Sequence, residues 1–412
     1  MIELQEHGHI DGIEQICDRY ENLSLVSWCK PMDKTPWGYY ASYFIGTEWI
    51  DEQEALIVTP KQGMEHIDFL GMFMTCFTSN LEVESFSQIY TLSSGQKAIS
   101  APALSGVVSP LIVLHFLGVV SRIKTLKKGY VHHSENLKKV KGHIAMIRNE
   151  RKNIAIKRYD RVFCEYDEYS EDIPENRLIK KALLFSQRLL KEMGESHRAY
   201  YRIKHTIIQC LGLFERVSDE VEMRNVGQSR SHKLYKDYAE AVRLAKLVLK
   251  HFDYSISNVT IDKEQVIPFT LDMSLLYEHY VYGLLHEAYQ NNVLYQYEGE
   301  TGKPDFLYRS NKFKAILDTK YIPKYVREGL DTYVTRQLSG YSRDLRILKG
   351  LGYYDIKEDT PLPPVPCVII YPEEGIDFEN PFLNKPFERL CNKKVKNLLN
   401  FYKIVIPIPT LE

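Results

Sequence analysis

The stretch GKPDFLYRSNKFKAILDTKYI, residues 302–322, decides the fold of the C-terminal part of this chain. Two apolar runs on either side of a short polar segment predict a β-hairpin. Asp305 stands near the start of the first predicted strand, and Asp318 and Lys320 stand near the end of the second. Acidic residues and lysine are poor strand formers, and charges are rarely buried without a partner. Their presence on a core hairpin therefore indicates a chemical role.

The spacing of these charges suits a metal-dependent hydrolytic site. Twelve residues separate Pro304-Asp305 from Asp318-Thr319-Lys320. Two carboxylates near the ends of adjacent strands can converge on one Mg²⁺, a hard cation that prefers oxygen ligands. Because strand side chains alternate with period two, Lys320 shares a face with Asp318 and could orient the attacking water or stabilise the phosphate in the transition state. Thr319 is expected to face away, with its backbone carbonyl as a further possible ligand.

The pattern has an ordinary interpretation as well. A bare [DE]xK is common, and two more occur here, at residues 150–152 and 355–357. Neither follows a Pro-Asp pair at hairpin distance, and Pro-Asp occurs only once in the sequence. The alternative is a structural hairpin in which Lys320 forms a salt bridge with one aspartate.

Hydrophobic periodicity places the hairpin within a longer order of helices and strands. The predicted order is a helix over 273–290, strands over 293–297, 305–308 and 313–321, a helix over 333–348, and strands over 365–371 and 403–408. In the first helix, Glu278 lies beside an apolar stripe formed by Leu275, Tyr282 and Leu285. A carboxylate at the edge of a buried face needs a partner, for which a metal or a lysine would serve; the alternative is a solvent-exposed glutamate.

Two further pairs of residues stand on these helices. Gln337 and Tyr341 are four residues apart and share a face, which could touch a phosphate at the site or simply pack. His279 and His286 are seven residues apart on the preceding helix, and we expect them on its polar face rather than at a metal.

The first part of the chain is predicted to be rich in β-structure, and the middle is predicted to be helical. Up to about residue 100, short β-branched and aromatic runs alternate with Pro, Gly and Asp. The apolar run Ala101–Val120 is interrupted by Pro102, Pro110 and His115, so we predict a buried helix that begins near Pro110 and not a membrane span. The helical pattern extends over about 107–129, and helices resume from Pro174, a proline suited to a first turn.

A basic stretch follows that apolar run. Residues 120–161 contain 13 Lys and Arg against three Asp and Glu, a formal local charge of +10, with Tyr130, His132 and His133 among them. One interpretation is a solvated face balanced by acids elsewhere, and the other is a surface that contacts DNA phosphates. The candidate DNA-contacting residues are Lys138, Lys139, Lys141, Arg148, Arg151 and Lys152.

The composition narrows the class of protein. The chain has 412 residues, 44% hydrophobic and 26% charged, which is ordinary for a globular protein with a sizeable core. The formal net charge of -1 makes no global demand for nucleic acid, so any such contact is local. Seven scattered cysteines without a CxxC pair, and no apparent secretory signal, lead us to expect a cytoplasmic protein. Neither GxxxxGK[ST] nor GxGxxG occurs, so the sequence offers no support for nucleotide binding by this chain.

Several quoted stretches together resemble a known family. The order of elements around 305–320 resembles the PD-(D/E)xK nuclease core, whose members often take a further acid from the preceding helix. LLYEHYVYGLL, KPDF, AILDTKY and QLSGY resemble the nuclease domain of McrC, the endonuclease subunit of the McrBC modification-dependent restriction system. ASYFIGTEWI, DFLGMFMTCF and, most specifically, VFCEYDEYSEDIPENRLIKKAL extend that similarity over most of the chain.

The resemblance implies a division of labour. Such a protein cleaves DNA together with an AAA+ GTPase partner, McrB, which supplies modified-base recognition, 5-methylcytosine in the type system, and GTP-driven translocation. The N-terminal region of such a subunit docks into the partner's hexameric ring and stimulates its GTPase. The site residues that the resemblance implies are Asp305, Asp318, Lys320 and Glu278, with Gln337 and Tyr341 in support and Mg²⁺ held by the three acids.

The resulting prediction is an α+β chain of three parts. Residues 1–106 form a β-rich partner-docking domain, 107–255 a mainly helical region with the basic patch, and 256–412 an α/β PD-(D/E)xK nuclease domain with a mixed central sheet. Two other functions stay open: a non-catalytic adaptor that clamps DNA for an AAA+ motor, and a nuclease that acts alone. The adaptor predicts loss of Asp305, Asp318 or Lys320, and all three are present.

Overall fold

The chain forms two compact units. The computed structural model describes all residues except 12–14, 31–34, 63, 65, 79–87, 94–95, 196–199, 222–225, 228–234, 258–264, 323–329, 358–360, 362, 376–378 and 411–412. Unit 1 combines Met1–Leu114, Ser196–Ile203 and Ser257–Glu412, and unit 2 combines His115–Glu195 with Lys204–Ile256. Helices and mixed sheets occur together, which confirms the α+β class. The predicted division of the chain into residues 1–106, 107–255 and 256–412 stays a prediction, and residues 258–264, close to its second boundary, lie outside the described part.

Unit 1 contains a five-stranded sheet in the order β1-β5-β4-β12-β6. Its strands are β1 (Ile2–Gln5), β5 (Ala55–Thr59), β4 (Phe44–Trp49), β12 (Phe269–Asp272) and β6 (Tyr90–Leu92). Only β1 and β5 are parallel among these neighbours. Gly46 lies where β4 meets β12, and its φ of +142° together with the carbonyl of Phe269 leaves no space for a side chain. A strand that follows the helical middle in sequence thus completes the N-terminal sheet.

Smaller elements surround this sheet. They are α1 (Asp18–Glu21), the hairpin β2 (Val26–Cys29) and β3 (Gly38–Ala41), α2 (Phe69–Thr78), the pair β7 (Ile99–Ser100) and β11 (Gln265–Val266), and the 3₁₀ turn Pro102–Leu104. β2 to β5 confirm the strands predicted from the aromatic and β-branched runs before residue 100.

The second sheet of unit 1 has six strands in the order β13-β14-β15-β16-β18-β17. Its strands are β13 (Val293–Tyr295), β14 (Phe306–Arg309), β15 (Lys314–Thr319), β16 (Cys367–Gly375), β18 (Phe401–Pro409) and β17 (Lys393–Lys394). The three central strands β15, β16 and β18 run parallel, and the others are antiparallel to their neighbours. The predicted mixed central sheet is therefore present.

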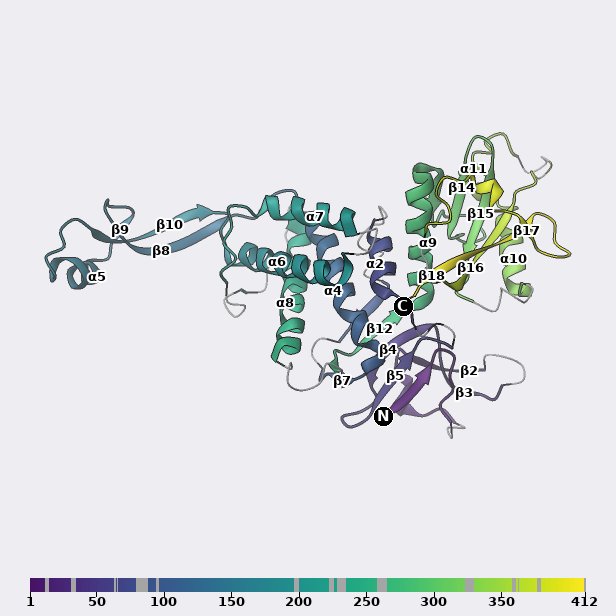
Figure 1. Ribbon diagram of the computed structural model, residues 1–412, viewed down its shortest axis with the longest axis horizontal. Helices are drawn as coiled ribbons and strands as arrows, with labels where there is room; N and C mark the ends of the chain where they lie inside the picture. Colours follow the sequence, from purple (N-terminus) through teal and green to yellow (C-terminus); the bar gives the residue numbers. More distant parts are fainter. Residues whose placement is uncertain are drawn as a thin grey trace. The chain divides into compact units, whose positions relative to one another are not determined.

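Helices lie on both faces of this second sheet (Figure 1). α9 (Met273–Tyr289) begins directly after β12, and the Asp272 side chain caps it by accepting hydrogen bonds from the amides of Ser274 and Leu275. Tyr282 of α9 stacks on Phe306 of β14, so α9 covers that face. α10 (Thr332–Tyr341) and α11 (Leu345–Gly350) pack on the opposite face, over Leu307 and Ile316.

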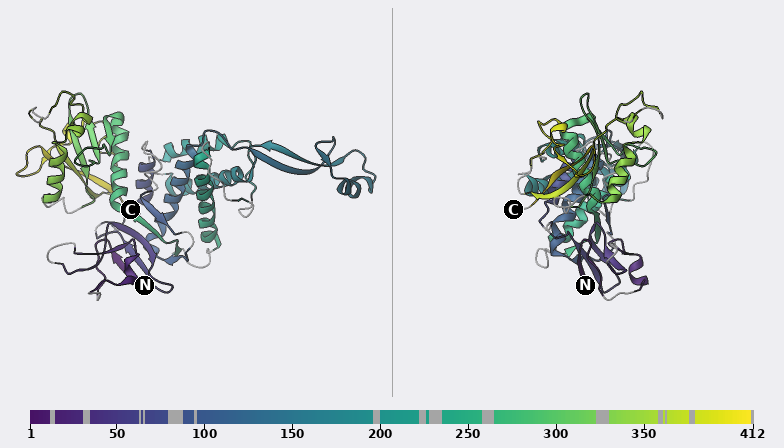
Figure 2. Two further views of the ribbon diagram at one scale, coloured as in Figure 1. Left: turned by 180° about the vertical axis from the view of Figure 1, so that it is seen from behind. Right: turned by 90° about the vertical axis from the view of Figure 1, so that its right-hand side faces the viewer.

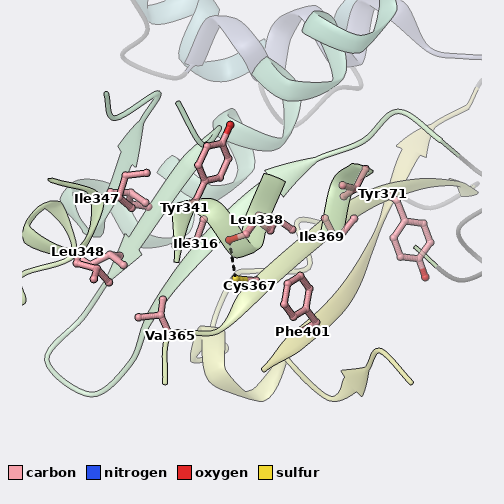
Figure 3. Packing of buried hydrophobic residues seen from close by; sticks show 13 residues of the cluster. Ile316, Leu338, Tyr341, Ile347, Leu348, Val365, Cys367, Ile369, Tyr371 and Phe401 are labelled. Atoms are coloured by element: carbon pink, nitrogen blue, oxygen red, sulfur yellow. Dashed lines mark hydrogen bonds between the residues drawn. The ribbon is translucent and has the colours of Figure 1, made fainter. Parts of the chain in front are cut away.

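The core beneath α10 and α11 is drawn in Figure 3. Leu338 and Tyr341 of α10 pack with Ile316 of β15 and Cys367 of β16, and the Cys367 thiol lies 3.6 Å from the Leu338 carbonyl. All four side chains are buried, and burial of a large apolar side chain contributes about 1.5–3 kcal/mol. This cluster holds α10 against the strands that carry the hairpin charges.

One predicted helix is in fact two. The pattern predicted a single helix over 333–348, but α10 ends at Tyr341 and α11 begins at Leu345. Asp344 is the reason, because its side chain accepts hydrogen bonds from the amides of Arg346 and Ile347 and starts a new helix. The 3.6-residue periodicity continues across such a break, so it does not reveal the break.

Unit 2 consists of helices and a long β-ribbon (Figure 2). Its helices are α6 (Pro174–Gly194), most of α7 (Tyr200–Leu213), α8 (Lys236–Ser257) and the second half of α4 (Ser105–Ser121). β8 (Gly129–Leu137) pairs with β10 (Val162–Ser170) over nine residues, and β9 (His143–Ile144) adds to β10. The short α5 (Met146–Asn149) and the π-helical turn Glu150–Ile154 lie at the far end of the ribbon from α6 (Figure 1).

The apolar run is a buried helix, as predicted, but its bounds differ. Residues Pro102–Ser121 are long and apolar enough to cross a membrane by length and composition, yet 82% of the apolar window is buried inside the structure. The helix begins at Ser105 and not near Pro110, which lies inside it, and it extends to Ser121 and not to 129. After Ser121 the chain is not helical. The Lys127 amide donates to the Tyr238 hydroxyl, and the Asn176 side-chain amide donates to the Lys127 carbonyl, so the backbone at Lys127 is bonded to other helices instead.

Candidate functional site

The two aspartates of the hairpin lie opposite each other at one end of the second sheet. Phe306 pairs with Leu317 in the antiparallel register of β14 and β15. Asp305 directly precedes Phe306 and Asp318 directly follows Leu317, so both carboxylates start from the same level of the hairpin. Directly opposed residues of an antiparallel pair point to the same face. The hairpin therefore brings the two acids together as the spacing predicted.

Asp318 is buried beside an ammonium group. Its side chain is 1% exposed, and Lys320 Nζ lies 2.6 Å from its Oδ2. Burial and then the charge of Asp305 raise the pKa of Asp318 to about 7, although Lys320 pulls it down. Burial lowers the pKa of Lys320, but the charges of Asp318 and Asp305 outweigh that effect and raise it. The salt bridge of the alternative interpretation thus exists, but in a buried site where isolated ion pairs add little stability.

Asp305 is held by Thr319. The Thr319 amide donates to Asp305 Oδ2 at 2.6 Å, and the Thr319 hydroxyl donates to the same oxygen. Burial raises the pKa of Asp305, while Lys320 and the bonds from Thr319 oppose the increase. Thr319 was expected to face away from the site. That expectation is wrong for its side chain, whose hydroxyl reaches Asp305, the residue directly before β14.

Glu278 stands on α9 within electrostatic reach of the hairpin. Burial, followed by the charge of Asp305, raises the pKa of Glu278 to about 8. Gln296 Nε2 donates to Glu278 Oε1 at 2.9 Å, and the Gln296 amide donates to the Asp305 carbonyl at 2.8 Å. Gln296 adopts a φ of +43°, a conformation that a non-glycine residue rarely takes. This glutamine links the helix acid to the hairpin.

His279 does not lie on a polar face, and this expectation is wrong. His279 is 1% exposed, its Nε2 lies 3.0 Å from the Tyr295 hydroxyl, and burial lowers its pKa to about 4. His286 is half-buried. The physical reason is that α9 lies between α2 and the second sheet, where Gly283 approaches the Thr75 carbonyl too closely for a side chain. A helix enclosed in this way has almost no polar face.

Gln337 and Tyr341 share a face of α10, as predicted. Gln337 Nε2 donates to the Tyr341 hydroxyl at 2.8 Å, and that hydroxyl donates to the Lys303 carbonyl at 3.2 Å. Gln337 Oε1 is buried and receives no hydrogen bond. Burial raises the pKa of Tyr341, and the charges of Asp318 and Asp305 raise it further. Tyr341 thus lies close enough to the hairpin for the charges of Asp318 and Asp305 to affect its pKa.

The site as a whole is a pair of opposed aspartates with one ammonium and a third acid nearby. In the part of the chain that the structure describes, no group of three or more His, Cys, Asp or Glu side chains is arranged to hold a metal ion. A metal here would therefore rest on Asp305 and Asp318, with Glu278 held aside by Gln296. The role of Glu278 as a direct metal ligand stays a prediction.

The basic stretch contains β8, β9 and α5, and acids of the neighbouring strand β10 oppose part of its charge. Lys141 Nζ lies 3.2 Å from Glu168, and Arg148 lies 2.9 Å from Glu165. The other four candidate DNA-contacting residues, all exposed, are Lys138, Lys139, Arg151 and Lys152. His132 pairs with Asp167 and His133 stacks on Tyr166. All six candidates are thus exposed and lie in the segment between β8 and β10, far in sequence from the hairpin acids.

Sequence reasoning missed three residues that shape the site: Thr319, Tyr295 and Gln296. Thr319 stands inside the Asp-Thr-Lys triplet, so its position was visible but its bond to Asp305 was not. Tyr295 and Gln296 end the strand after α9 and reach Glu278 only because β13 pairs with β14. No spacing within the sequence signals that pairing.

Comparison with known proteins adds the family. A family model described as McrBC 5-methylcytosine restriction system component matches residues 52–342. A chain in a structure described as the refined half-complex from a tetradecameric assembly of Thermococcus gammatolerans McrB AAA+ hexamers with bound McrC is 15% identical, with a TM-score of 0.39, over 100% of this chain and 95% of that one.

A second structure, the cryo-EM structure of the Thermococcus gammatolerans McrBC complex, contains a chain that is 14% identical, with a TM-score of 0.30, over 69% of this chain and 86% of that one. No curated protein matches the chain. The family match covers more than half of the residues and includes Glu278, the hairpin and Tyr341. The chain therefore belongs to the family of McrBC 5-methylcytosine restriction system components.

Proposed function

We propose that this chain is the McrC-like endonuclease subunit of a modification-dependent restriction complex and hydrolyses DNA phosphodiester bonds at a PD-(D/E)xK site. The observation that carries the proposal is the buried Asp318 beside Lys320 and level with Asp305. Carboxyl pKa values raised by burial and by a neighbouring acid are frequent at catalytic sites. The order α9, β13, β14, β15, α10, β16 and the family membership support the same assignment.

The donor set suits Mg²⁺. This ion is usually held by one or two carboxylates and otherwise keeps water and substrate phosphate oxygens. Asp305 and Asp318 supply two such carboxylates, and the pKa of Asp318 is raised by burial and then by the charge of Asp305. When bound, Mg²⁺ would supply Lewis-acid stabilisation of the charge on the scissile phosphate. The same two residues would hold it.

The other residues have roles that follow from their positions. The Lys320 ammonium, which lies 2.6 Å from Asp318, would orient the attacking water and stabilise the negative charge of the phosphate in the transition state. Thr319 favours the ionised form of Asp305 through two donated hydrogen bonds, against the effect of burial. Glu278, whose pKa is about 8, would hold a proton at neutral pH until a nearby cation favours its ionised form.

The proposed partner is a McrB-like AAA+ GTPase hexamer, with double-stranded, modified DNA as substrate. Family membership supports this partner. GTP is assigned to the partner because the sequence has no GxxxxGK[ST]. Docking to the partner and stimulation of its GTPase are assigned to the β-rich N-terminal region. The protein alone should accordingly show little specific cleavage of methylated plasmid in Mg²⁺, and efficient site-specific cutting without a partner would contradict the subunit assignment.

The central test compares cleavage with partner GTP turnover. Asp318→Ala and Lys320→Ala should each lower the rate of DNA cleavage by at least about 10³-fold in the complex. Both variants should still stimulate GTP turnover, because that role belongs to another part of unit 1. Glu278→Ala should be milder if it only completes the acidic wall.

The chain offers a matched control. Asp355 and Lys357 form a second DxK pattern in an exposed segment, so Asp355→Ala and Lys357→Ala should cleave at the rate of the unmodified protein. If Asp318→Ala and Lys320→Ala also cleave at that rate, the nuclease assignment is wrong and the DNA-clamping adaptor replaces it.

A further inference from the structure

Two charged residues next to strands of the first sheet, Glu6 and Lys61, lie against Tyr321, the residue that follows Lys320. The Lys61 ammonium donates to the Tyr321 carbonyl at 2.8 Å and lies 3.3 Å from the centre of the Tyr321 ring. The Tyr321 hydroxyl donates to Glu6 Oε2 at 3.3 Å, and the Lys61 amide donates to the same oxygen at 3.0 Å. Glu6 follows β1 and Lys61 follows β5, so two parallel strands of one sheet deliver this pair.

The pair is costly to bury. Glu6 is 4% exposed, Tyr321 is 3% exposed, and Glu6 Oε1 has no hydrogen-bond partner. Burial raises the pKa of Glu6 to about 7 and lowers the pKa of Lys61 to about 8, although each charge favours the other. Replacing such a pair with apolar side chains is often neutral or stabilising. Fold stability alone is therefore a weak reason for charges at this position.

What the pair touches suggests another reason. Tyr321 directly follows Lys320, and the Lys320 amide donates to the Ile370 carbonyl of β16 at 2.8 Å. The backbone on either side of Lys320 is thus fixed by β16 on one side and by Lys61 on the other. Burial raises the pKa of Tyr43, which precedes β4, and the charges of Glu6 and Lys320 also affect it, so Glu6 and the site ammonium lie within electrostatic reach of one tyrosine.

The first sheet is joined to the second at other points as well. β12 of the first sheet continues directly into α9, the helix of Glu278. The Met273 amide at the start of α9 donates to the Tyr43 carbonyl, and the Asp68 amide donates to the Pro409 carbonyl at the end of β18. The N-terminal part of unit 1 is therefore connected to the start of α9 and to the end of β18.

We propose that Glu6 and Lys61 are positioning residues for the Lys320 ammonium, so that the N-terminal sheet sets the geometry of the site in the C-terminal sheet. Lys61 holds the Tyr321 carbonyl and ring, Glu6 holds Lys61 and the Tyr321 hydroxyl, and the backbone at Lys320 is thereby restrained so that its Nζ stays on Asp318. This inference rests on the proposed nuclease function for its effect on cleavage, but its structural part can be measured without activity.

The test uses a neutral pair and a matched control. Glu6→Gln with Lys61→Met removes both charges together and leaves no unpaired buried charge, so the variant is expected to fold. Lys314 is the control, because its ammonium also donates to a backbone carbonyl, that of Gly352, and lies 4.0 Å from the centre of a tyrosine ring, at the opposite end of β15. Tyr321→Phe serves as a gentler variant that removes only the hydroxyl bonded to Glu6.

Two readouts separate positioning from packing. The first is the cleavage rate in the complex: the neutral pair should lower kcat by about 10- to 100-fold and change KM for DNA by less than about twofold, since misplacement by 1 Å can cost 10²-fold. The second is the rate at which an amine-reactive reagent labels Lys320, followed by mass spectrometry across pH. Release from Asp318 should lower the pKa of Lys320 and increase that rate at neutral pH. Lys314→Met should change neither.

The outcomes distinguish the two proposals. If the neutral pair folds with unchanged Lys320 labelling and unchanged kcat while Lys320→Ala abolishes cleavage, the positioning role is wrong and the pair only packs. If Lys320→Ala itself cleaves normally, the nuclease assignment fails, and the labelling of Lys320 still decides whether the pair positions it. A failure of the double variant to fold leaves Tyr321→Phe to decide by the same two measurements, with a smaller expected effect.

Discussion

The hairpin and the β8–β10 ribbon are both charged stretches of the sequence, yet the structure treats their charges in opposite ways. On the hairpin, Asp318 is 1% exposed and its pKa rises to about 7 under burial and the charge of Asp305. On the ribbon, Lys141 and Arg148 stand in solvent and pair with acids of the neighbouring strand. The same kinds of charged residue are thus constrained in one region and solvated in the other.

The difference teaches that the density of charge is a poor guide to chemistry. The basic stretch 120–161 carries a formal charge of +10, but exposed ion pairs are screened and contribute little free energy. The hairpin carries three charges in a desolvated place, where each alters the protonation of the others. A reactive site is therefore expected at the hairpin, and at most an electrostatic contact surface at the ribbon.

The largest expected effect that tests this difference between the hairpin and the ribbon concerns metal binding. Asp318→Ala should weaken Mg²⁺ binding by at least about tenfold, because the ion loses one of two carboxylate ligands. Lys320→Ala should retain binding, since an ammonium is no ligand for a cation. Isothermal titration calorimetry on the two variants, with circular dichroism to confirm the fold, checks both expectations. Equal affinity of Asp318→Ala and the unmodified protein would place the metal elsewhere.

The next effect is a pH dependence of stability. The pKa values of Asp318 and Glu278 are about 7 and about 8, above those of unfolded carboxyl groups. The folded state therefore binds more protons than the unfolded state, so its stability is greatest below about pH 4 for these groups and falls as pH rises toward 8. The metal-free protein should lose on the order of 1–3 kcal/mol from these groups between pH 5 and pH 8.

Thermal unfolding at several pH values, with and without Mg²⁺, measures this loss. Mg²⁺ should stabilise the protein more at pH 8 than at pH 5, and Asp318→Asn should flatten the profile. A melting temperature that rises steadily from pH 5 to pH 8 without metal, in the variant as in the unmodified protein, would show that other groups dominate the stability.

A smaller effect tests the ribbon. Charge reversal at Lys138, Lys139 and Lys141 should weaken DNA binding and make the slope of log affinity against log salt shallower by about 2–3, if these residues contact phosphates. Reversal of three exposed lysines on the helices of the same unit is the control: Lys181, Lys191 and Lys204. Equal slopes for both triple variants, measured by fluorescence anisotropy, would return the ribbon to a solvated face.

The smallest effect concerns one ion pair of the ribbon. Arg148 and Glu165 are 2.9 Å apart, with the arginine side chain 58% exposed. Their coupling free energy in a double-mutant cycle on unfolding should not exceed about 1 kcal/mol. A coupling free energy above that value, measured by urea denaturation, would mean that the Arg148–Glu165 pair stabilises the ribbon more than its solvent exposure suggests.

Local patterns predicted much of the C-terminal part of the chain. The helix over 273–290 is α9, the strands over 293–297 and 313–321 are β13 and β15, and the charges at 318 and 320 share a face because side chains alternate along a strand. The hairpin register follows from the same alternation. The break at Asp344 and the burial of His279 were not visible, because both depend on what packs against the helix.

Other assignments needed contacts between segments that are far apart. β12 joins the N-terminal sheet although it stands beside α9 in the sequence, and Gln296 reaches Glu278 only through the pairing of β13 with β14. Residues 129–137 form a strand because β10 offers nine partners, a pairing that the local pattern does not reveal.

The sequence by itself determined which residue types could form a site and where, since Asp305, Asp318 and Lys320 follow from a hairpin and a period of two. The tertiary structure alone decided how those groups ionise and what restrains them. Burial of Asp318, the bonds from Thr319 to Asp305, and the Glu6–Lys61 pair against Tyr321 all depend on segments brought together by folding. The physical reason is that periodicity is a property of the local backbone, whereas desolvation and charge coupling depend on everything within a few ångströms in space.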